Sequence, residues 1–412
     1  MRYNLIIDYS YLCYKSLYTI TGLKRTEEEK FLDNDYDKCL LTKKILKDIQ
    51  FVIDKATELV SKENLESIVL CCDSKTNFRK RILPESYKQD RKKHRDEKTT
   101  INFDEYFKVI SNVSDVLKNS SDIISVLKHD EFEADDLIYG MSSNNNYNLI
   151  YASDSDLEQT LSENTHMFKT YRDNKTIYVN ESLKPKSDGF DDFLKKDDDF
   201  FDNFFSNKGV ETISDDFDLL KQCKTLDYKI EKINPLELVV CKIILGDTSD
   251  NIQSIFYGID EGCIKKKCRK QFVKKILNKY LTKDDNSKYF DIRSKLEADM
   301  FFKFFVEHLI TEKYIDVECG VSDKLLENLN VNYDLIVFSD NTYKKYCNET
   351  PTEYINNSEI KRFNVGGYRM EFENNDIFLK ITDSLKVTDK DTIEQFTKVK
   401  DKENIVEIEF KI

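Results

Sequence analysis

The stretch LIYASDSDLEQTL, residues 149–161, joins a strongly apolar run to a group of carboxylates. Its first five residues have the pattern of a buried strand, and Asp154, Asp156 and Glu158 follow directly. Carboxylates at the end of a buried strand repel one another and lose hydration. The sequence therefore requires a source of positive charge at this point of the fold.

Two more apolar runs end in an aspartate. Residues 5–7 lead to Asp8, and residues 68–72 lead to Asp73. Continuous apolar runs separated by helical patterns predict an α/β fold, with a mostly parallel central sheet flanked by helices. In such sheets the functional crevice lies beyond the carboxyl ends of the strands. We therefore expect Asp8, Asp73 and Asp154 to line one crevice.

The composition predicts a globular intracellular protein. The 412 residues are 40% hydrophobic and 12% aromatic, which is enough for one large core or two smaller ones. No run of about 18 apolar residues occurs, and Asp8 interrupts the N-terminal apolar run, so we expect no membrane association and a cytoplasmic location. The ten cysteines have neither a disulfide framework nor paired zinc-site spacing, so we expect buried, reduced thiols.

The net charge of −13 is unevenly distributed. Residues 75–98 hold ten Lys or Arg against four acids, and residues 264–279 hold eight Lys or Arg and no acid. Residues 187–218 instead hold eleven acids and three Lys. Two basic segments are thus available to a polyanion, although either segment alone fits a solvated helix face equally well.

Changes of pattern divide the chain into four parts. We predict an α/β core over residues 1–180, an acidic insertion over 181–233, a helical subdomain over 234–315 and a strand-rich region of unknown role over 316–412. Pro235 is placed well to start the first helix of the subdomain.

The strand-rich prediction rests on alternation of apolar and polar residues. The segments that carry it are DLIVF (334–338), YRMEFENNDIFLKI (368–381) and ENIVEIEFKI (403–412).

Two further acidic segments stand out. DEFEADDLIYGM, residues 130–141, places Glu133, Asp135 and Asp136 at a helix start, where the helix dipole favours negative charge. LGDTSDNI, residues 245–252, places Asp247 and Asp250 three residues apart. Each segment alone fits a capped helix start or a turn.

Together these segments predict a metal site of nine carboxylates, and the chain has only four His. The nine are Asp8, Asp73, Glu133, Asp135, Asp136, Asp154, Asp156, Asp247 and Asp250. Oxygen ligands suit Mg²⁺, with Mn²⁺ as a substitute. Two such ions roughly 3.5 to 4 Å apart would clamp a phosphate and activate a hydroxide without a histidine base. With basic segments beside them, we expect the substrate to be a phosphodiester.

In their order along the chain, these segments resemble the 5′ nucleases of the flap endonuclease superfamily, among them the RNase H-type 5′ to 3′ exonucleases of T-even phages. The matching segments are IIDYSYL (6–12), IVLCCDSKTNFRKRILPESYKQDR (68–91), FEADDLI (132–138), YASDSDLEQTL (151–161) and KIILGDTSDNI (242–252). The resemblance covers roughly residues 1–260 apart from the acidic insertion. It implies a PIN-like core with a basic arch at about residues 75–98, and a helix-three-turn-helix in the helical subdomain.

The resemblance also implies roles for single residues. A first, catalytic ion would be held by Asp8, Asp73, Glu133, Asp135 and Asp154. A second ion would be surrounded by Asp136, Asp156, Asp247 and Asp250. The arch residues that would draw in the 5′ strand are Arg79, Arg81, Lys88 and Arg91. Among these, Lys88 is expected to be the active-site cation, and Arg79 is the next choice.

The chain departs from the family pattern at two places. Ser155 stands where the family has a glycine. Residues 258–262 carry Asp260 and Glu261 in place of a simple Gly-Ile-Gly hairpin, whose amides bind duplex backbone in relatives. We therefore expect basic side chains, acting as point charges, to contact the phosphates of the duplex instead of the hairpin amides. These are Lys265, Lys266, Lys267, Arg269 and Lys270.

We expect a Mg²⁺-dependent 5′ to 3′ exonuclease and flap endonuclease with RNase H-type activity. Its substrates would be 5′ ends or flaps of DNA and RNA–DNA duplexes. It would remove primers during bacteriophage DNA replication, and we expect it to act as a monomer in the host cytoplasm. A single-stranded-DNA-binding protein or a sliding clamp are the expected protein partners. A non-catalytic nucleic-acid-binding protein of the same fold is the alternative, and a phosphotransferase with Asp154 as nucleophile is a third reading.

Overall fold

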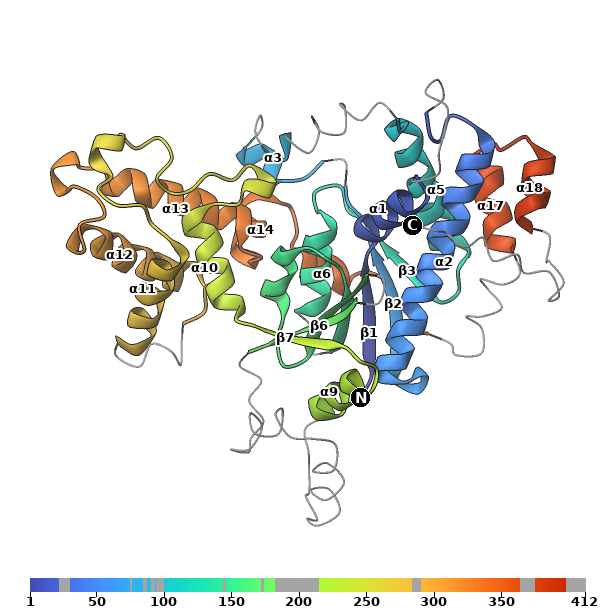
Figure 1. The fold of residues 1–412 in the computed structure, drawn as a ribbon, viewed down its shortest axis with the longest axis horizontal. Helices are drawn as coiled ribbons and strands as arrows, with labels where there is room; N and C mark the ends of the chain where they lie inside the picture. The colour runs from blue at the N-terminus through green and yellow to red at the C-terminus, as the bar shows by residue number, and fades with distance from the viewer. Residues whose placement is uncertain are drawn as a thin grey trace, which may run out of the picture.

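A seven-stranded sheet forms the centre of the computed structural model (Figure 1). The structure describes residues 1–21, 30–74, 76–83, 87–89, 93, 100–143, 146–171, 174–181, 215–283, 290–363 and 375–397. The strand order is β3-β2-β1-β4-β5-β6-β7, and every neighbouring pair is parallel except β5 and β6. The strands are β1 (Tyr3–Asp8), β2 (Leu65–Cys71), β3 (Ile124–Leu127), β4 (Tyr147–Tyr151), β5 (Thr165–Tyr171), β6 (Asn174–Asn180) and β7 (Lys229–Ile233). The predicted α/β fold with a mostly parallel sheet is confirmed.

The central strands are apolar throughout because both faces of the sheet are covered. All six residues of β1 are buried, and Ile6 pairs with Val69 of β2 on one side and with Ile150 of β4 on the other. This register brings the carboxyl ends of β1, β2 and β4 to one edge of the sheet. Parallel pairing thus places the aspartates that follow these strands together.

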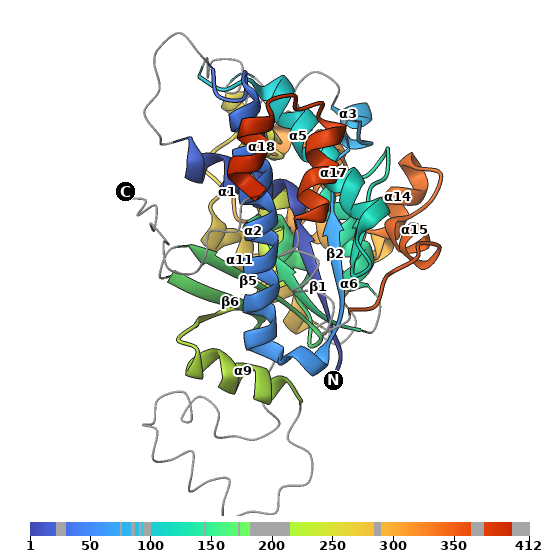
Figure 2. The ribbon, with the colours of Figure 1, turned by 90° about the vertical axis from the view of Figure 1, so that its right-hand side faces the viewer.

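One face of the sheet is covered by helices α1, α2 and α5, with α9 at its lower end (Figure 2). These helices are α1 (Tyr9–Ile20), α2 (Asp35–Val60), α5 (Phe103–Ser120) and α9 (Asp215–Thr225). Leu5, Ile7 and Leu70 of the sheet pack in one cluster with Ile45 and Ile49 of α2. Asn34 caps α2 by accepting a hydrogen bond from the Asp37 amide at 2.9 Å, which fixes where this long helix begins.

The other face is covered by α6 (Ala134–Ser142) together with α14 (Asp340–Tyr346) and α15 (Pro351–Asn356). Helix α15 lies so close to α6 that a Cβ on Gly140 would meet the Pro351 carbonyl carbon at 2.8 Å. Glycine at position 140 is therefore needed for this contact. The C-terminal part of the chain thus completes one layer of the core domain.

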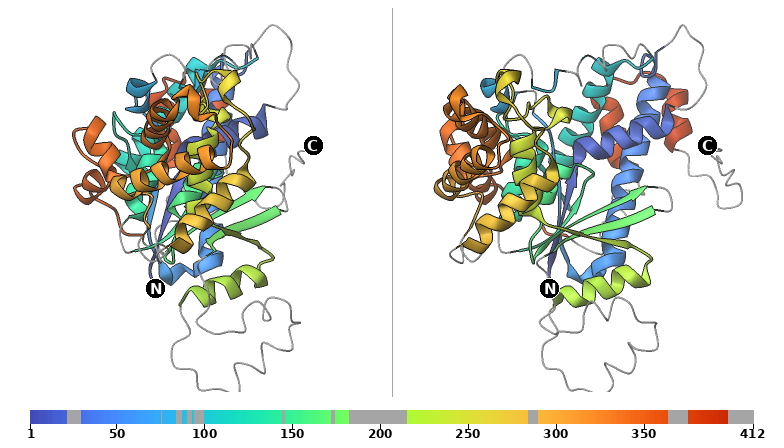
Figure 3. Two further views of the ribbon diagram at one scale, coloured as in Figure 1. Left: turned by 90° about the vertical axis from the view of Figure 1, so that its left-hand side faces the viewer. Right: turned by 60° about the vertical axis from the view of Figure 1, so that its left-hand side comes forward.

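A helical unit with its own core projects from the sheet, and it faces the viewer in the left panel of Figure 3. It contains α10 (Pro235–Leu245), α11 (Lys270–Thr282), α12 (Lys295–Thr311) and α13 (Ser322–Ile336). Pro235 is the first residue of α10, as predicted, and Asn234 accepts a hydrogen bond from the Glu237 amide at 3.0 Å. The helical unit has a hydrophobic cluster of its own, and this cluster extends beyond the predicted end at residue 315 because Leu325, Leu329 and Tyr333 of α13 belong to it.

The C-terminal prediction of strands is wrong for the part of the tail that the structure describes. Residues 316–363 and 375–397 contain no strand and form helices, among them α17 (Asp376–Ser384) and α18 (Lys390–Thr397). Ile377, Phe378 and Ile381 are buried at helical spacing against α2 and α5. Short apolar runs fit either a strand or one face of a helix, so alternation alone misled the prediction. The run at residues 403–412 lies outside the described residues.

The predicted acidic insertion is too long at its C-terminal end. Residues 182–214 lie outside the described residues, but α9 packs against α2, and β7 pairs with β6 in the sheet. Leu219 and Cys223 of α9 belong to the core cluster of the sheet. Residues 215–233 are therefore part of the core domain.

No helix in the described ranges is both long and apolar enough to cross a membrane.

Candidate active site

Three aspartates meet at the carboxyl edge of the sheet, as the strand pattern predicts. Asp8 ends β1 and caps α1, where its Oδ1 accepts a hydrogen bond from the Tyr11 amide at 2.9 Å. Asp73 follows β2, and its Oδ1 accepts from the Ala134 amide at 2.9 Å, which ties this loop to the start of α6. Asp154 follows β4 and caps the short 3₁₀ helix η2 (Ser155–Thr160).

Asp135, in the first turn of α6, completes a group of four carboxylates. Burial raises the pKa of Asp135 well above its usual range, and the charges of Asp154, Asp8 and Asp73 raise it further. Burial, followed by the charges of Asp73 and Asp154, raises the pKa of Asp8 from 3.8 to about 7. Among the described residues, none of the four takes part in an ion pair, unlike neighbouring acids. We call Asp8, Asp73, Asp135 and Asp154 the unpaired group.

The part of the chain that carries this group matches a known family. Residues 4–187 match the model of the 5′-3′ exonuclease, N-terminal resolvase-like domain. The match covers the strands and the helix that carry all four aspartates of the unpaired group. The 5′ nuclease resemblance and the PIN-like core expected from the sequence are thereby confirmed for the sheet domain. The helical unit and the C-terminal helices lie outside the matched residues.

Solved structures similar to the whole chain come from bacteriophage T5. A T5 5′-exonuclease with bound zinc ions shares 13% identity, at a TM-score of 0.45, over 87% of this chain and 100% of its own. The T5 flap endonuclease in a pseudo-enzyme–product complex with DNA and metal ions shares 12% identity, at a TM-score of 0.47, over 94% of this chain and 99% of its own. No curated protein matches the sequence significantly.

Glu133 lies beside the unpaired group, but its carboxylate accepts hydrogen bonds from protein donors. Lys88 Nζ donates to its Oε1 at 2.7 Å, and the Tyr87 hydroxyl donates to its Oε2 at 2.8 Å. Asn77 also donates to Oε1, at 3.0 Å. Burial alone would raise the pKa of Glu133, but the charges of Lys88 and Arg79 outweigh it and lower the pKa to about 2. Glu133 is therefore ionised and neutralised without a metal.

Lys88 is held in the site by its backbone as well as by its ammonium group. Its φ angle is +55°, an unusual value for a lysine, and its amide donates to the Asp250 carbonyl at 3.3 Å. Its Nζ lies 3.9 Å from Asp250 Oδ2 in addition to its contact with Glu133. The residue expected to be the active-site cation thus lies between two of the predicted carboxylates.

Asp136 does not fit the predicted second ion. Its side chain is fully buried, and its two oxygens accept hydrogen bonds from Arg79 Nη1 at 2.9 Å and Nη2 at 2.7 Å. The Tyr343 hydroxyl of α14 donates at 2.8 Å, and the Glu133 amide donates at 2.8 Å. Four donors leave this carboxylate no role that needs a metal.

Arg79 does not fit the predicted contact with phosphate for the same reason. The residue is only 3% exposed, and its Nε donates to the Leu335 carbonyl of α13 at 2.9 Å. Arg79 begins the four-residue helix α3 (Arg79–Ile82) and joins the base of the arch to the C-terminal helices. Arg81 is exposed and pairs with Glu131 at 2.6 Å, and Arg91 lies outside the described residues.

Asp156 and Asp247 are joined by a lysine that the sequence analysis did not single out. Lys242 Nζ donates to Asp156 Oδ1, to Asp247 Oδ2 at 2.9 Å and to Ser155 Oγ at 3.0 Å. Burial raises the pKa of Asp156 to about 6, although Lys242 opposes the shift. Burial alone would lower the pKa of Lys242, but Asp156 and Asp247 raise it above its usual range.

The nine predicted carboxylates therefore divide into two sets. Five accept hydrogen bonds or ion pairs from Arg79, Lys88 or Lys242, and the unpaired group of four does not. As the side chains stand, the described residues contain no group of three or more His, Cys, Asp or Glu that could hold a metal ion. The donor set of the unpaired group, which contains only carboxylate oxygens and is unbalanced in charge, still fits a hard cation.

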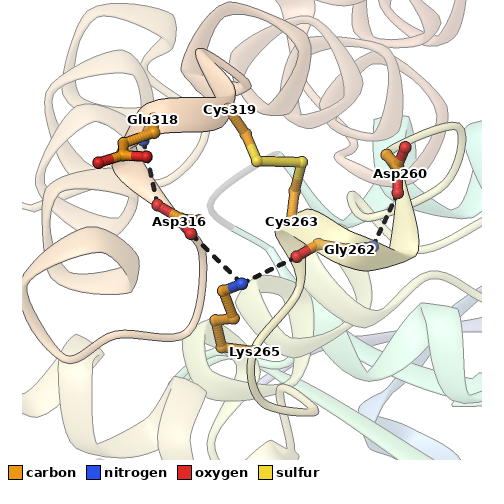
Figure 4. The surroundings of a disulfide bond; sticks show 7 residues. All are labelled: Asp260, Gly262, Cys263, Lys265, Asp316, Glu318 and Cys319. Atoms are coloured by element: carbon orange, nitrogen blue, oxygen red, sulfur yellow. Dashed lines mark hydrogen bonds and ion pairs between the residues drawn. A yellow bond between two sulfur atoms is a disulfide. The ribbon is translucent and has the colours of Figure 1, made fainter.

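The predicted duplex-binding lysines lie at the N-terminal end of α11 and just before it. All five of the basic residues in 265–270 are exposed. Lys265 Nζ donates to the Gly262 carbonyl at 3.0 Å and pairs with Asp316 at 3.3 Å (Figure 4). The Asp260 carboxylate accepts a hydrogen bond from the Gly262 amide at 2.7 Å, so the hairpin amide is already used. In this arrangement the Gly262 amide is not free to bind a phosphate.

A disulfide between Cys263 and Cys319 closes this region (Figure 4). The expectation of reduced thiols is wrong for these two residues and holds for the other eight cysteines, which are free. The two cysteines lie 56 residues apart in sequence, and only the packing of the helical unit brings them together. Sequence spacing could not reveal this pair.

Sequence reasoning also missed three polar partners that fix the site. Lys242 lies in an apolar helix where a lone lysine has no distinctive pattern, and Tyr343 and Tyr87 are two of 23 tyrosines. Their roles follow from contacts across the fold.

Proposed function

We propose that this chain is a divalent-cation-dependent 5′ to 3′ nuclease. It hydrolyses phosphodiesters at the 5′ ends or flaps of DNA and of RNA–DNA duplexes. Its role is the removal of primers during bacteriophage DNA replication. The observation that carries the proposal is the unpaired group at the carboxyl edge of the sheet, inside a 5′-3′ exonuclease domain. The charges of these carboxylates raise the pKa of Asp8 and of Asp135, so a cation is needed before all four can ionise together.

The residues proposed to hold Mg²⁺ or Mn²⁺ are Asp8, Asp73, Asp135 and Asp154. Three of them already use one oxygen on a backbone amide, because Asp8 accepts from Tyr11, Asp73 from Ala134 and Asp154 from Asp156. These bonds orient the carboxylates and leave the second oxygen of each for the ion. A bound ion would offset charge on the phosphate and lower the pKa of an attacking water.

Lys88 is proposed to steady the negative charge of the substrate phosphate. Its ammonium lies close enough to Asp8 and Asp135 that its charge lowers the pKa of both. Its raised pKa keeps it protonated at neutral pH, since Glu133 and Asp250 outweigh the effect of burial. The contact with Glu133 orients the ammonium before substrate arrives.

Duplex binding is proposed to rest on the exposed basic residues at 265–270. Lysine and arginine contacts to phosphate release counterions, so affinity should fall steeply as salt rises. These contacts carry no sequence information, which suits a nuclease that recognises the form of a 5′ end.

The experiment that tests this proposal is digestion of 5′-labelled DNA flaps and RNA–DNA hybrids in Mg²⁺, repeated with a chelator. Release of short labelled products in Mg²⁺ that stops with chelator is the expected result. Binding of both substrates without any cleavage in Mg²⁺ or Mn²⁺ would contradict the proposal. That outcome would instead favour a non-catalytic nucleic-acid-binding protein of the same fold.

A further inference from the structure

The ammonium group of Lys242 occupies a cation position built from three oxygens. Its three N–H groups meet Asp156 Oδ1, Asp247 Oδ2 and Ser155 Oγ, so every donor has an acceptor. The side chain of Lys242 is 18% exposed, and that of Asp247 is 11% exposed. These carboxylates are two of the four that the family resemblance assigns to a second ion.

The other two carboxylates of that set are also held by protein cations. Asp136 has both oxygens on Arg79, and Asp250 lies 3.9 Å from Lys88 and accepts from the Tyr87 hydroxyl at 3.4 Å. Three basic side chains thus neutralise the region where a second ion would bind. The unpaired group, in contrast, has no ion-pair partner among the described residues.

The backbone fixes Asp247 in its contact with Lys242. Gly246 has a φ angle of +80°, and a Cβ there would meet the Ile252 carbonyl oxygen at 2.5 Å. The Asp247 amide donates to the Ile252 carbonyl at 2.9 Å, and the Ile252 amide donates back at 2.8 Å. Asp247 Oδ1 also accepts from the Ser249 amide at 2.9 Å and from its hydroxyl at 2.6 Å. A tight, closed turn therefore returns this carboxylate to the last turn of α10, where Lys242 lies.

We propose that Lys242 takes the place of a second divalent ion between Asp156 and Asp247. This inference rests on the proposed function, in which the unpaired group binds the first ion. A divalent ion at the same oxygens would face an ammonium at hydrogen-bond distance, and like charges in a partly buried site repel strongly. Lys242 is a positioning residue in this proposal, because it holds the two carboxylates and does not itself contact the reacting atoms.

The test is a titration of the full chain with Mn²⁺, in which free Mn²⁺ is followed by electron paramagnetic resonance. Wild-type protein should bind about one ion per chain, and Lys242→Met should bind about two, because the freed carboxylates then resemble a two-ion site. Lys242→Arg keeps the charge and should stay at about one ion. Lys275→Met is the matched control, since Lys275 lies on the neighbouring helix α11 and pairs with Glu312.

Thermal unfolding separates a change in ion number from a change in folding. Lys242→Met should melt below wild type in chelator and recover more of its midpoint with Mn²⁺ than Lys275→Met does. Binding of two ions by wild type, or an unchanged ion number in folded Lys242→Met, would overturn the inference. If Lys242→Met fails to fold, binding of two ions by wild type or by Lys242→Arg would still overturn the inference.

Nuclease activity measured on the same preparations distinguishes this inference from the proposed function. Cleavage by a wild-type protein that binds two ions would leave the function standing and overturn the role of Lys242. An increase of one bound ion in Lys242→Met, in protein that cleaves no substrate, would support the role of Lys242 and contradict the function.

Discussion

The two terminal nitrogens of Arg79 donate to the two oxygens of Asp136, at 2.9 and 2.7 Å, in a pair that is almost completely buried. Arg79, which was expected to belong to the basic arch, therefore has a structural role. It joins α3 to α6 and, through Leu335 and Tyr343, to the C-terminal helices. Arg79 is therefore not available to a substrate phosphate, and we propose that Lys88 supplies the positive charge at the site.

Replacement of Arg79 by Met should lower the free energy of unfolding by about 3 to 5 kcal/mol, because it leaves a buried carboxylate without its cation. Urea unfolding followed by circular dichroism measures the change. Arg81→Met is the control, since Arg81 is exposed and pairs with Glu131 at the surface, and its cost should stay below about 1 kcal/mol. Equal stabilities for the two variants would contradict the structural role of Arg79.

The variants Asp135→Asn and Asp154→Asn should lose cleavage by about a hundredfold or more while they retain substrate binding, because each removes one charge from the proposed ion site. Cleavage is followed on a 5′-labelled flap, and binding is followed by fluorescence anisotropy in Ca²⁺. Asp299→Asn is a suitable control, since Asp299 lies on α12 of the helical unit and pairs with Lys295. Wild-type turnover by either site variant in Mg²⁺ would exclude the proposed ion site.

In chelator, the free energy of unfolding should fall as the pH rises from about 4 to about 7. The pKa of Asp8 is raised to about 7 from 3.8, so in this window the folded state holds a proton that the unfolded state has lost. The contribution of Asp8 to the free energy of unfolding is therefore fully present below its pKa in the unfolded chain, and it is lost as the pH rises through its pKa in the folded protein. Urea unfolding at several pH values should give a smaller dependence for Asp8→Asn. Addition of Mg²⁺ should remove much of the loss near neutral pH, and a loss that Mg²⁺ leaves unchanged would argue against an ion at Asp8.

Lys267→Gln combined with Lys270→Gln should weaken duplex binding and reduce its dependence on salt. Each lost phosphate contact should lower the slope of log affinity against log salt by about 0.9. Fluorescence anisotropy with a duplex at several salt concentrations measures both effects. Lys324→Gln, a change on the exposed surface of α13, should leave the slope unaltered. If the double variant kept the wild-type slope, Lys267 and Lys270 would not contact phosphate and the duplex would bind to another surface.

The apolar runs that each end in an aspartate were enough to predict the parallel sheet and the cluster of aspartates at its carboxyl edge. Asp8, Asp73 and Asp154 each follow a continuous apolar run, and parallel pairing brings such ends to one edge whatever the details of packing. Asp135 joins them because a helix starting at the same edge places its first turn there. These predictions need only local patterns and general topology.

The partners of the remaining carboxylates could not be predicted in this way. Whether Asp136 faces a metal or Arg79 depends on where Tyr343 and Leu335 lie, some two hundred residues later in the chain. Lys242 reaches Asp156 across 86 residues. The helices of the tail were misread because Ile377, Phe378 and Ile381 fit one helical face as well as a strand.

The reversal between β5 and β6 has a practical consequence for labelling the protein. Because β6 runs antiparallel to β5, Asn180 ends β6 at the edge of the sheet opposite to Asp8. Helix α9, which precedes β7, lies near the same edge (Figure 1). Glu181, which follows Asn180, is therefore at the edge of the sheet opposite to the carboxylates. A fluorophore or affinity tag attached at Glu181 would be placed at the opposite edge of the sheet from the proposed chemistry.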